Sequence, residues 1–368
     1  MATSTVTDAR DTERRDALVQ RLFEAAIGAL DVFSVYIGDR LGLYSALGER
    51  GSTTAHELAV ATGTDERYVR EWLEQQAATG LLEVEDVQAE ATSRRFRLPA
   101  PYREVFLDRD SLNYLSPLLR LVIGVSKPLP ALLRAYREGG GVPYPDYGPD
   151  TLEGIADMNR PMFLNQLGTE WLPAVPDVHA RLQADPPARV ADVGCGSGWS
   201  SIAIARAYPK VRVDGLDLDE ASISLARANA AMAGLSDRVS FSVRDAADPG
   251  LAGQYDLVTA FETLHDMSRP VEALRAMRSL ANEEGAVVIA DERVGDVFSA
   301  PGDDIERLNY GFSVMHCLAV GMAEQPSAGT GTVMRLPTLQ GYANQAGFRA
   351  VEVLPIEHDF WRFYRLVR

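Results

Sequence analysis

Apolar residues near the start of the chain recur at helical spacing. Between residues 17 and 47 they stand three or four positions apart and occupy more than one face of the implied helices, as in Leu18, Leu22, Ala25, Ala26, Leu30, Phe33, Ile37 and Leu41. Because a helix of a small domain usually has one apolar face, a second such face needs a partner outside that domain. The pattern predicts helices that pack against something larger, such as a second subunit.

A pair of shorter helices with capping signals follows. Thr53 or Thr54 is placed to cap a helix that ends at Gly63. Asp65 is placed to cap a second helix, which runs over residues 66–79. Ser, Thr and Asp are favoured at helix N-termini because their side-chain oxygens accept hydrogen bonds from otherwise unpaired backbone N–H groups.

Two short strands complete this module. Residues 81–84 and 95–99 flank a polar turn and are expected to pair, so that helix, turn, helix and hairpin form a winged-helix pattern. Such a module binds DNA or serves a structural and dimerisation role. DNA binding needs excess positive charge, whereas residues 1–110 hold 20 acidic and 13 basic side chains. We therefore favour dimerisation for this domain, which we assign to residues 1–109.

Residues 110–185 are expected to be a helical linker or cap. A long helical stretch begins near residue 114 and has Pro117 and Pro128 as candidate kinks. The loop over residues 139–149 is rich in glycine, proline and tyrosine, a composition that suits a lid or the rim of a pocket. Thr151 is placed to cap the next helix.

From residue 186 onward, short β-rich runs alternate with helical runs. This alternation is the signature of a doubly wound α/β domain with a parallel sheet. The last two runs are only a few residues apart and predict an antiparallel hairpin at the sheet edge. The predicted strands are residues 189–193, 211–217, 239–245, 255–260, 286–291, 350–354 and 361–367.

A glycine-rich turn follows the first of these strands. Residues 190–199 read VADVGCGSGW, and glycine lets the backbone turn sharply and lets a ligand approach the main chain. Trp199 stands where a dinucleotide-binding fingerprint has its third glycine, and the lysine of a P-loop is absent. The turn therefore suits neither a pyrophosphate nor a nucleoside triphosphate.

Two acids stand at the next predicted strand ends. Asp217 is placed to accept hydrogen bonds from the vicinal hydroxyls of a ribose, and Asp245 to accept one from the exocyclic amine of adenine. A glycine turn and two acids at successive strand ends describe a nucleoside site without a phosphate requirement. S-adenosylmethionine matches that description.

With these motifs, residues 186–368 resemble the class I S-adenosylmethionine-dependent methyltransferases. The segment 255–262 matches the family's fourth motif, whereas residues 282–285 depart from its usual proline-glycine turn. The resemblance implies a Rossmann-like, seven-stranded domain with S-adenosylmethionine as cofactor; a related fold with a repurposed site is the alternative. The cofactor contacts expected on this basis are Asp192, Gly194, Cys195, Gly196, Gly198, Asp217, Leu218, Asp245, Ala246, Phe261 and Glu262.

A segment that contains a histidine is expected to lie beside the methyl acceptor. Residues 263–267 read TLHDM, and with the winged-helix module they resemble the plant-type and bacterial small-molecule O-methyltransferases. In that family a histidine of a similar segment is the general base, and the N-terminal helices form a homodimer. His265 is therefore the candidate base, with a role in shaping the pocket as the alternative. His316, on the apolar run 312–322, is a weaker candidate or an ordinary core histidine.

Other chemistries are disfavoured. Carboxylates near the ends of the fourth and fifth strands suggest magnesium, but the aspartate and asparagine set of catechol-type enzymes is missing, so we expect no metal. The Asn/Asp-Pro-Pro-aromatic segment that serves methylation of nucleic-acid bases is also missing. We expect a small, partly apolar acceptor that is methylated at oxygen. Methylation at nitrogen or carbon, and a transcriptional regulator that senses S-adenosylmethionine, are the alternatives.

Composition bears on the partners and the cellular location that we expect for the protein. The chain has 368 residues with 46% hydrophobic content and a net charge of −16, which argues against a nucleic-acid partner. Two cysteines cannot build a disulfide framework, and the first residues lack a signal-peptide core. The apolar stretch 118–133 is interrupted by charges and prolines, so we expect no membrane span. The expectation is a cytoplasmic homodimer with a winged-helix domain (1–109), a helical linker or cap (110–185) and a methyltransferase domain (186–368).

Overall fold

The computed structural model describes residues 9–246 and 248–368. The chain forms two compact units, Met1–Ile123 and Gly124–Arg368. The first unit extends past the boundary expected at residue 109, and the second unit contains most of the expected cap together with the sheet. The three-part division itself stays a prediction.

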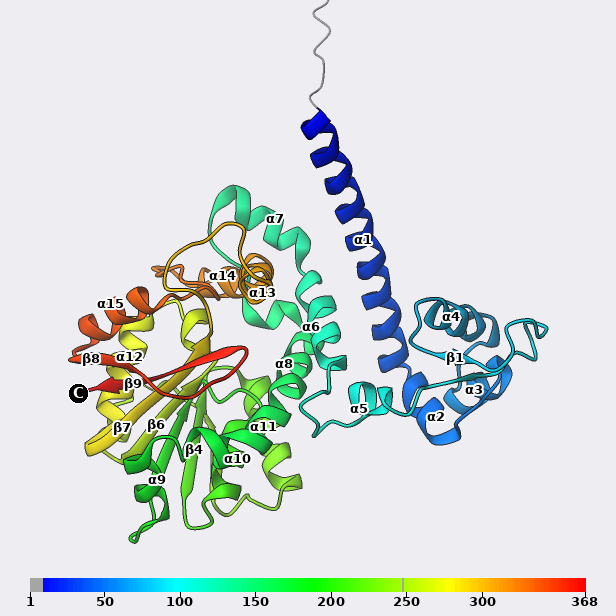
Figure 1. The fold of residues 1–368 in the computed structure, drawn as a ribbon. Coiled ribbons are helices and arrows are strands. Elements are labelled where there is room, and N and C mark those ends of the chain that lie inside the picture. The colour runs from blue at the N-terminus through cyan, green and yellow to red at the C-terminus, as the bar shows by residue number, and fades with distance from the viewer. Residues whose placement is uncertain (1–8, 247) are drawn as a thin grey trace, which may run out of the picture. The chain divides into compact units, whose positions relative to one another are not determined.

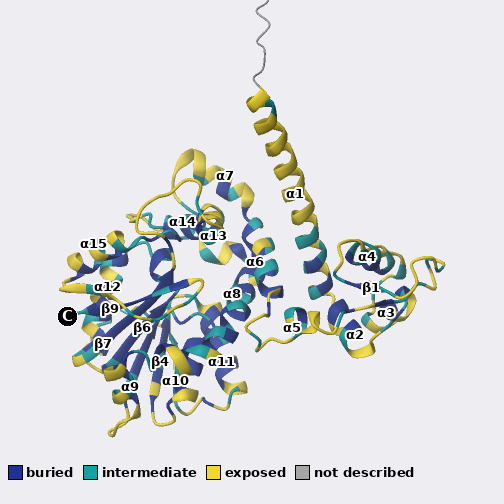
Figure 2. Cartoon of the chain, viewed as in Figure 1, coloured by how far each residue is buried: buried dark blue, intermediate teal, exposed yellow. Residues whose placement is uncertain are grey.

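A 32-residue helix, α1 (Ala9–Arg40), opens the first unit. It begins at Ala9, eight residues before the helical pattern that is predicted from residue 17; residues 1–8 lie outside the described part of the chain. Figure 2 shows that most of α1 is exposed. The other elements of this unit are α2 (Leu43–Arg50), α3 (Ala55–Thr62), α4 (Glu66–Ala78), β1 (Glu83–Val84), β2 (Phe96–Arg97) and α5 (Tyr102–Leu107), and α6 (Ser116–Ser126) runs across its boundary.

The winged-helix pattern is confirmed at its caps. Thr54 accepts a hydrogen bond from the backbone N–H of Glu57, whose carboxylate accepts one from the backbone N–H of Thr54, so this pair forms a capping box. Asp65 caps α4 through two backbone N–H groups. Thr53 instead forms a β-bridge with Phe96, which ties the start of α3 to the short hairpin.

The second unit is built on one seven-stranded sheet (Figure 1). The strand order is β5-β4-β3-β6-β7-β9-β8; the first five strands are parallel, and β9 runs antiparallel to both of its neighbours. The predicted Rossmann-like sheet with an antiparallel edge hairpin is therefore confirmed. The strands are β3 (Arg189–Val193), β4 (Arg212–Asp217), β5 (Val239–Val243), β6 (Tyr255–Phe261), β7 (Ala281–Glu292), β8 (Ala350–Val353) and β9 (Trp361–Val367).

Helices cover both faces of this sheet, so the central strands are buried on both sides and read as nearly continuous apolar runs. One face packs against η2 (Phe163–Trp171), α9 (Pro176–Gln183), α10 (Trp199–Ala207) and α11 (Glu220–Met232). The other face packs against α12 (Pro270–Leu280) and α15 (Leu336–Ala346).

The remaining helices lie between residues 124 and 171, after β5, after β6 and in the insertion after β7. They are α7 (Leu129–Glu138), η1 (Tyr144–Tyr147), α8 (Pro149–Met162), η3 (Pro249–Leu251), η4 (Leu264–Asp266), α13 (Asp304–Phe312), η5 (Ser313–Cys317) and α14 (Leu318–Gly321). The predicted break at Pro128 is confirmed between α6 and α7. The predicted cap at Thr151 is wrong, because α8 already begins at Pro149 and Thr151 lies inside its first turn.

No single helix within residues 9–246 and 248–368 has the length and hydrophobicity of a membrane span. The pair α6 and α7 reaches those values only when its two helices, bent by 55°, are counted together.

Candidate functional site

The strand order places a ligand crevice at the ends of β3 and β6. On one side of β3 the sheet continues through β4 to β5, and on the other side it continues from β6, so the strand order changes direction between β3 and β6. Ligands of such sheets bind at this switch point, outside the carboxyl ends of the strands. Gly194, just after β3, lies against the Thr263 side chain, just after β6, so closely that a Cβ atom would collide with it. The glycine is therefore required for the two strand ends to meet.

The glycine turn and Asp217 form one hydrogen-bonded unit. Gly194, Gly196 and Gly198 all have positive φ angles, of 66°, 50° and 80°, which side-chain-bearing residues avoid. The backbone N–H of Gly196 donates to Asp217 Oδ2 and that of Asp219 to Oδ1, both at 2.9 Å. Each oxygen of Asp217 keeps a further lone pair, so the carboxylate is prepared to accept two hydroxyl groups. Burial raises the pKa of Asp217, although these N–H groups oppose the shift.

Asp192 has a different environment from the one predicted. Its carboxylate is buried and accepts hydrogen bonds from Ser200 (2.5 Å), Ser201 (2.7 Å) and Thr259 (2.8 Å). These hydroxyls tie the end of β3 to the first turn of α10 and to β6. The three hydroxyl donors suit Asp192 to positioning the glycine turn, and its contact with the cofactor stays a prediction.

The other predicted cofactor residues gather at the same edge of the sheet. Asp217 pairs with Val243, two positions before Asp245, in the register of β4 and β5, and the strand end at Asp245 and Ala246 therefore neighbours that of Leu218. The side chain of Leu218 is 71% exposed, which suits an apolar contact with a base. By contrast, Cys195 and Phe261 are buried.

His265, in η4, is held between two carboxylates. Its Nδ1 lies 2.7 Å from Asp291 Oδ1, and its Nε2 lies 3.2 Å from Asp266 Oδ1. Burial lowers the pKa of His265, but the two negative charges outweigh burial and hold that pKa well above its usual value. Both ring nitrogens therefore face a carboxylate, and the role of His265 as the base stays a prediction.

His316 has the opposite environment. It lies in the π-helical turn η5, its Nδ1 is 3.4 Å from Cys317 Sγ, and its Nε2 is buried with no hydrogen-bond partner among the described residues. Burial lowers the pKa of His316, so the ring is neutral at pH 7. The rings of Tyr147 and Tyr144 stand edge-on to it, with centroids at 4.5 and 5.8 Å.

The half-buried Glu262 and the buried Glu292 meet beside His265. Glu262 follows β6 with φ 54°, a left-handed conformation that is unusual for a residue with a side chain. Its carboxyl group accepts a hydrogen bond from Asn159 of α8. Burial and the repulsion between the two carboxyl groups raise the pKa of Glu292, and burial raises that of Glu262. The two carboxyl groups therefore destabilise each other when both are ionised.

Several residues of this region carry no sequence signal. Asn159 contacts Glu262 from more than a hundred positions away, and the loop residues Tyr144 and Tyr147 reach His316 from a similar sequence distance. The loop is docked on the inserted helix, since Val142 N–H donates to the Ala319 carbonyl at 2.9 Å. Only the glycine-proline-tyrosine composition of residues 139–149 pointed to this part of the site.

Sequence comparisons agree with this geometry. A family profile described as "Methyltransferase domain" matches residues 184–324, and a "Rv2258c-like winged HTH domain" matches residues 29–109. The ubiquinone biosynthesis O-methyltransferase of Marinobacter nauticus is 34% identical over 28% of this chain and 43% of its own. The ajmaline N-methyltransferase of Rauvolfia serpentina is 30% identical over 28% of this chain and 35% of its own. The matches thus span less than half of each relative.

Solved structures extend the similarity of fold to nearly the whole chain. Mitomycin 7-O-methyltransferase superposes with a TM-score of 0.71 at 19% identity, covering 97% of this chain and 99% of its own. Human N-acetylserotonin methyltransferase, solved in complex with S-adenosylmethionine, has a TM-score of 0.63 at 18% identity and covers 100% and 99%.

The fold and the site geometry are therefore similar to those of Rossmann-like methyltransferases, and residues 184–324 match the profile of a methyltransferase domain. The chain joins this domain to an N-terminal winged helix-turn-helix domain, and it has the fold of the small-molecule O-methyltransferases among its structural neighbours.

Proposed function

We propose that this protein transfers a methyl group from S-adenosylmethionine to an oxygen atom of a small, partly apolar molecule. The observation that carries the proposal is the Asp217 carboxylate, which is fixed by two backbone N–H groups and keeps one free lone pair on each oxygen for a ribose diol. S-adenosylmethionine, when bound, supplies a methyl group made electrophilic by its sulfonium centre.

The chain's own residues then bind and orient this cofactor. Asp217 accepts the ribose hydroxyls, Leu218 covers one face of the adenine, and Asp245 accepts from its amine. The main chain of Gly194, Cys195, Gly196 and Gly198 lets the ligand approach closely, while Ala246, Phe261 and Glu262 complete the wall at the neighbouring strand ends. Asp192 keeps the glycine turn in place.

On the acceptor side the two histidines have separate roles. His316 Nε2 has no hydrogen-bond partner among the described residues and its ring is neutral, so it is the nitrogen that accepts the proton of the acceptor hydroxyl as the methyl group transfers. His265, held by Asp291 and Asp266, supplies a fixed positive charge that favours the ionised acceptor oxygen. His265 remains the second candidate for the base, at pH values above its raised pKa.

Methyl transfer is tested directly with methyl-labelled S-adenosylmethionine and a panel of phenols, alcohols, amines and thiols. We expect label in a phenol or alcohol product, and calorimetry should show that the protein binds S-adenosylmethionine without any acceptor. Absence of heat would contradict the cofactor assignment, and label found only in amines or thiols would contradict methylation at oxygen.

We also propose a homodimer formed through α1. Nine large apolar side chains of the segment 18–41 are exposed by 44–65%, namely Leu18, Val19, Leu22, Phe23, Ile27, Leu30, Phe33, Ile37 and Leu41. Monomers seldom expose so long an apolar surface, because it costs about 25 cal/mol for each Å² that stays in water. A second copy of the same helix would cover it.

The dimer is tested with Phe23→Glu, which places a charge in the middle of the exposed surface. We expect the wild-type mass in solution to be twice that of the chain and the variant to be monomeric, as measured by light scattering. The control Glu13→Lys, on the polar part of α1, should keep the dimer. A monomeric wild-type protein would contradict this proposal.

Nucleic acid is not the partner that we propose for the winged-helix unit. The arginines around α4 are neutralised by neighbours, since Arg67 pairs with Glu71 at 2.6 Å and Arg94 with Glu74 at 2.6 Å. Sequence-specific binding to upstream DNA at physiological salt, measured by gel shift, would contradict this view. The two cysteines are free and buried, which suits a reducing cytoplasm.

A further inference from the structure

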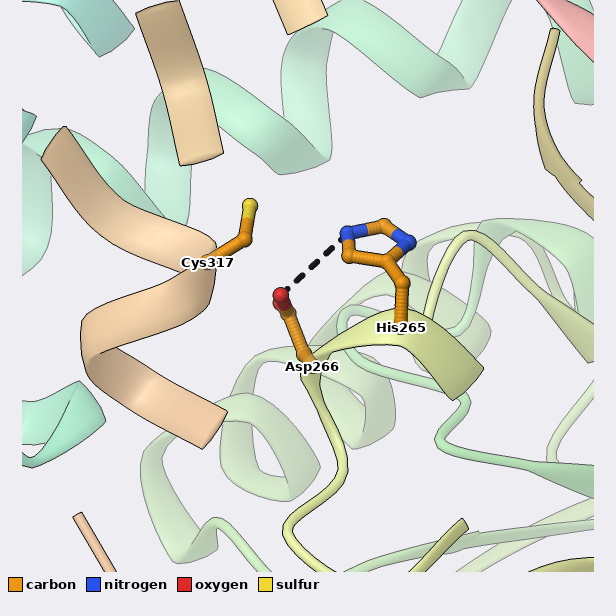
Figure 3. Close-up of side chains that lie close together, drawn as sticks. All are labelled: His265, Asp266 and Cys317. Carbon is orange, nitrogen blue, oxygen red and sulfur yellow. Dashed lines mark ion pairs between the residues drawn. The ribbon is translucent and has the colours of Figure 1, made fainter. Parts of the chain in front are cut away.

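Three side chains of different chemistry converge on the acceptor side of the second unit. His265 and Asp266 come from η4, directly after β6, and Cys317 comes from η5 in the inserted helix. One ligand-type atom of each lies within 4.8 Å of the other two. Figure 3 shows the imidazole and the carboxylate facing each other, with the Cys317 side chain beside them. His265 and Cys317 are 2% and 7% exposed.

The contact between His265 and Asp266 lacks the geometry of a hydrogen bond. Nε2 and Oδ1 are 3.2 Å apart, yet Oδ1 is buried and has no hydrogen-bond partner among the described residues. A nitrogen and an oxygen atom that both face a common metal ion lie this close to each other without being aligned for a hydrogen bond. Nitrogen and oxygen ligands at about 2.0–2.1 Å from a tetrahedral zinc ion lie roughly 3.3 Å from each other.

The surroundings also match those of metal-bound side chains. A metal-bound histidine almost always donates its other ring N–H to a carboxylate, which fixes the ring and strengthens it as a ligand. Asp291 provides this contact, with its Oδ1 at 2.7 Å from His265 Nδ1. His316 Nδ1 stands 3.4 Å from Cys317 Sγ, where it would donate to a thiolate and leave its Nε2 free.

Two carboxylates contact the same imidazole. Asp266 Oδ1 lies 3.2 Å from His265 Nε2, and Asp291 Oδ1 lies 2.7 Å from His265 Nδ1. Buried carboxylates are costly unless a positive group balances them. Asp291 Oδ2, also buried, has no hydrogen-bond partner among the described residues.

We propose that His265 Nε2, the Asp266 carboxylate and the Cys317 thiolate bind one thiophilic divalent metal ion, for which Zn²⁺ is the best match. A thiolate and an imidazole are soft ligands that exclude Mg²⁺, which takes oxygen ligands. The ion replaces the proton of the thiol and the proton on Nε2. Three protein ligands leave a fourth position open, as in catalytic zinc sites.

The use of the fourth position depends on the proposed function. The acceptor oxygen would bind there, and the metal would supply the positive charge that the imidazolium supplies without it, while His316 Nε2 receives the proton. Occupancy of the site by metal does not depend on methyl transfer, so the two are measured separately.

The test compares the chain's two buried cysteines. Protein stripped of metal is loaded with Zn²⁺ or Co²⁺, dialysed and measured by elemental analysis, with S-adenosylmethionine binding followed by calorimetry on the same samples. We expect about one metal ion per chain in the wild type and in the control Cys195→Ser. The Co²⁺ form should show a thiolate-to-metal absorption band in the near ultraviolet. Cys317→Ser should lose the band and most of the metal, and Asp266→Asn should bind it more weakly.

Two results would overturn the site. One is wild-type protein without stoichiometric metal, and the other is equal retention of metal and band in Cys317→Ser and Cys195→Ser. If the metal is absent while S-adenosylmethionine binds, the metal site alone is refuted. If the metal binds and S-adenosylmethionine does not, the proposed function fails and the metal site stands. Circular dichroism of each variant shows whether a loss reflects unfolding.

Discussion

The carboxylates on the two sides of the crevice differ in their hydrogen-bond partners. On the cofactor side, Asp192 accepts from three hydroxyls and Asp217 from two backbone N–H groups, so neutral donors satisfy both. On the acceptor side, Asp266 and Asp291 hold the same histidine, and each keeps one buried oxygen without a hydrogen-bond partner among the described residues.

The cofactor side is therefore preorganised, whereas the two carboxylates of the acceptor side share one imidazole. Neutral donors fix the cofactor carboxylates before the ligand arrives, which reduces the ordering cost of binding. On the acceptor side, carboxyl groups lie close together and Glu262 has a left-handed backbone conformation. Folded proteins retain such unfavourable features mainly at functional sites. We expect substitutions on the cofactor side to change affinity and those on the acceptor side to change turnover.

The largest expected effect is on the acceptor side, with His316→Asn. Loss of the free imidazole nitrogen should reduce kcat by about 10²–10⁴-fold, the usual contribution of a general base. The affinity for S-adenosylmethionine should stay unchanged, because His316 contacts none of the cofactor residues. Turnover is measured with the acceptor found in the labelled screen, and calorimetry gives the affinity.

The matched control is His179→Asn on α9, which should keep full turnover. His265→Asn should also lose turnover, through the loss of positive charge. Full activity of His316→Asn together with an inactive His265→Asn would return the role of base to His265.

An intermediate effect is expected on the cofactor side, with Asp217→Asn. The amide loses one of the two acceptor atoms for the ribose, and a lost hydrogen bond to a charged group weakens binding by about 10–100-fold. Calorimetry with S-adenosylmethionine measures the change. Asp248→Asn, an exposed acid after β5, is the control. Unchanged affinity in Asp217→Asn would mean that the ribose lies elsewhere.

The smallest effect concerns stability, with Glu292→Gln. The folded-state pKa of Glu292 is raised, so this acid destabilises the fold once the pH exceeds its unfolded-state pKa, and increasingly so up to the folded-state value. The neutral amide removes this penalty. We expect the melting temperature to rise by about 2–4 °C at pH 8 and by less at pH 5.

Scanning fluorimetry at the two pH values measures this shift. A lower melting temperature at both would show that the contact between Glu262 and Glu292 stabilises the fold, and the carboxyl groups of the acceptor side would then be as well stabilised as those of the cofactor side.

Local features were predictable wherever neighbouring residues decide the structure. The caps at Thr54 and Asp65, the break at Pro128 and the presence and order of the strands follow from side-chain oxygens, missing N–H groups and runs of apolar residues. The predicted start of β7 at residue 286 was wrong, because the strand already begins at Ala281. The prediction for Thr151 failed because Gly148 and Pro149 begin the helix first. A proline is favoured in the first helical turn, so it competes with a later capping residue.

By itself, the sequence determined the glycine turn, the acids at the strand ends and hence the nucleoside side of the crevice, because these motifs are contiguous or follow strands in a regular order. Tertiary structure alone decided which groups meet on the acceptor side. Asn159, Cys317 and Glu292 reach that region from different elements. The state of each histidine depends on the burial and charge supplied by those distant residues, so spacing along the chain cannot encode it.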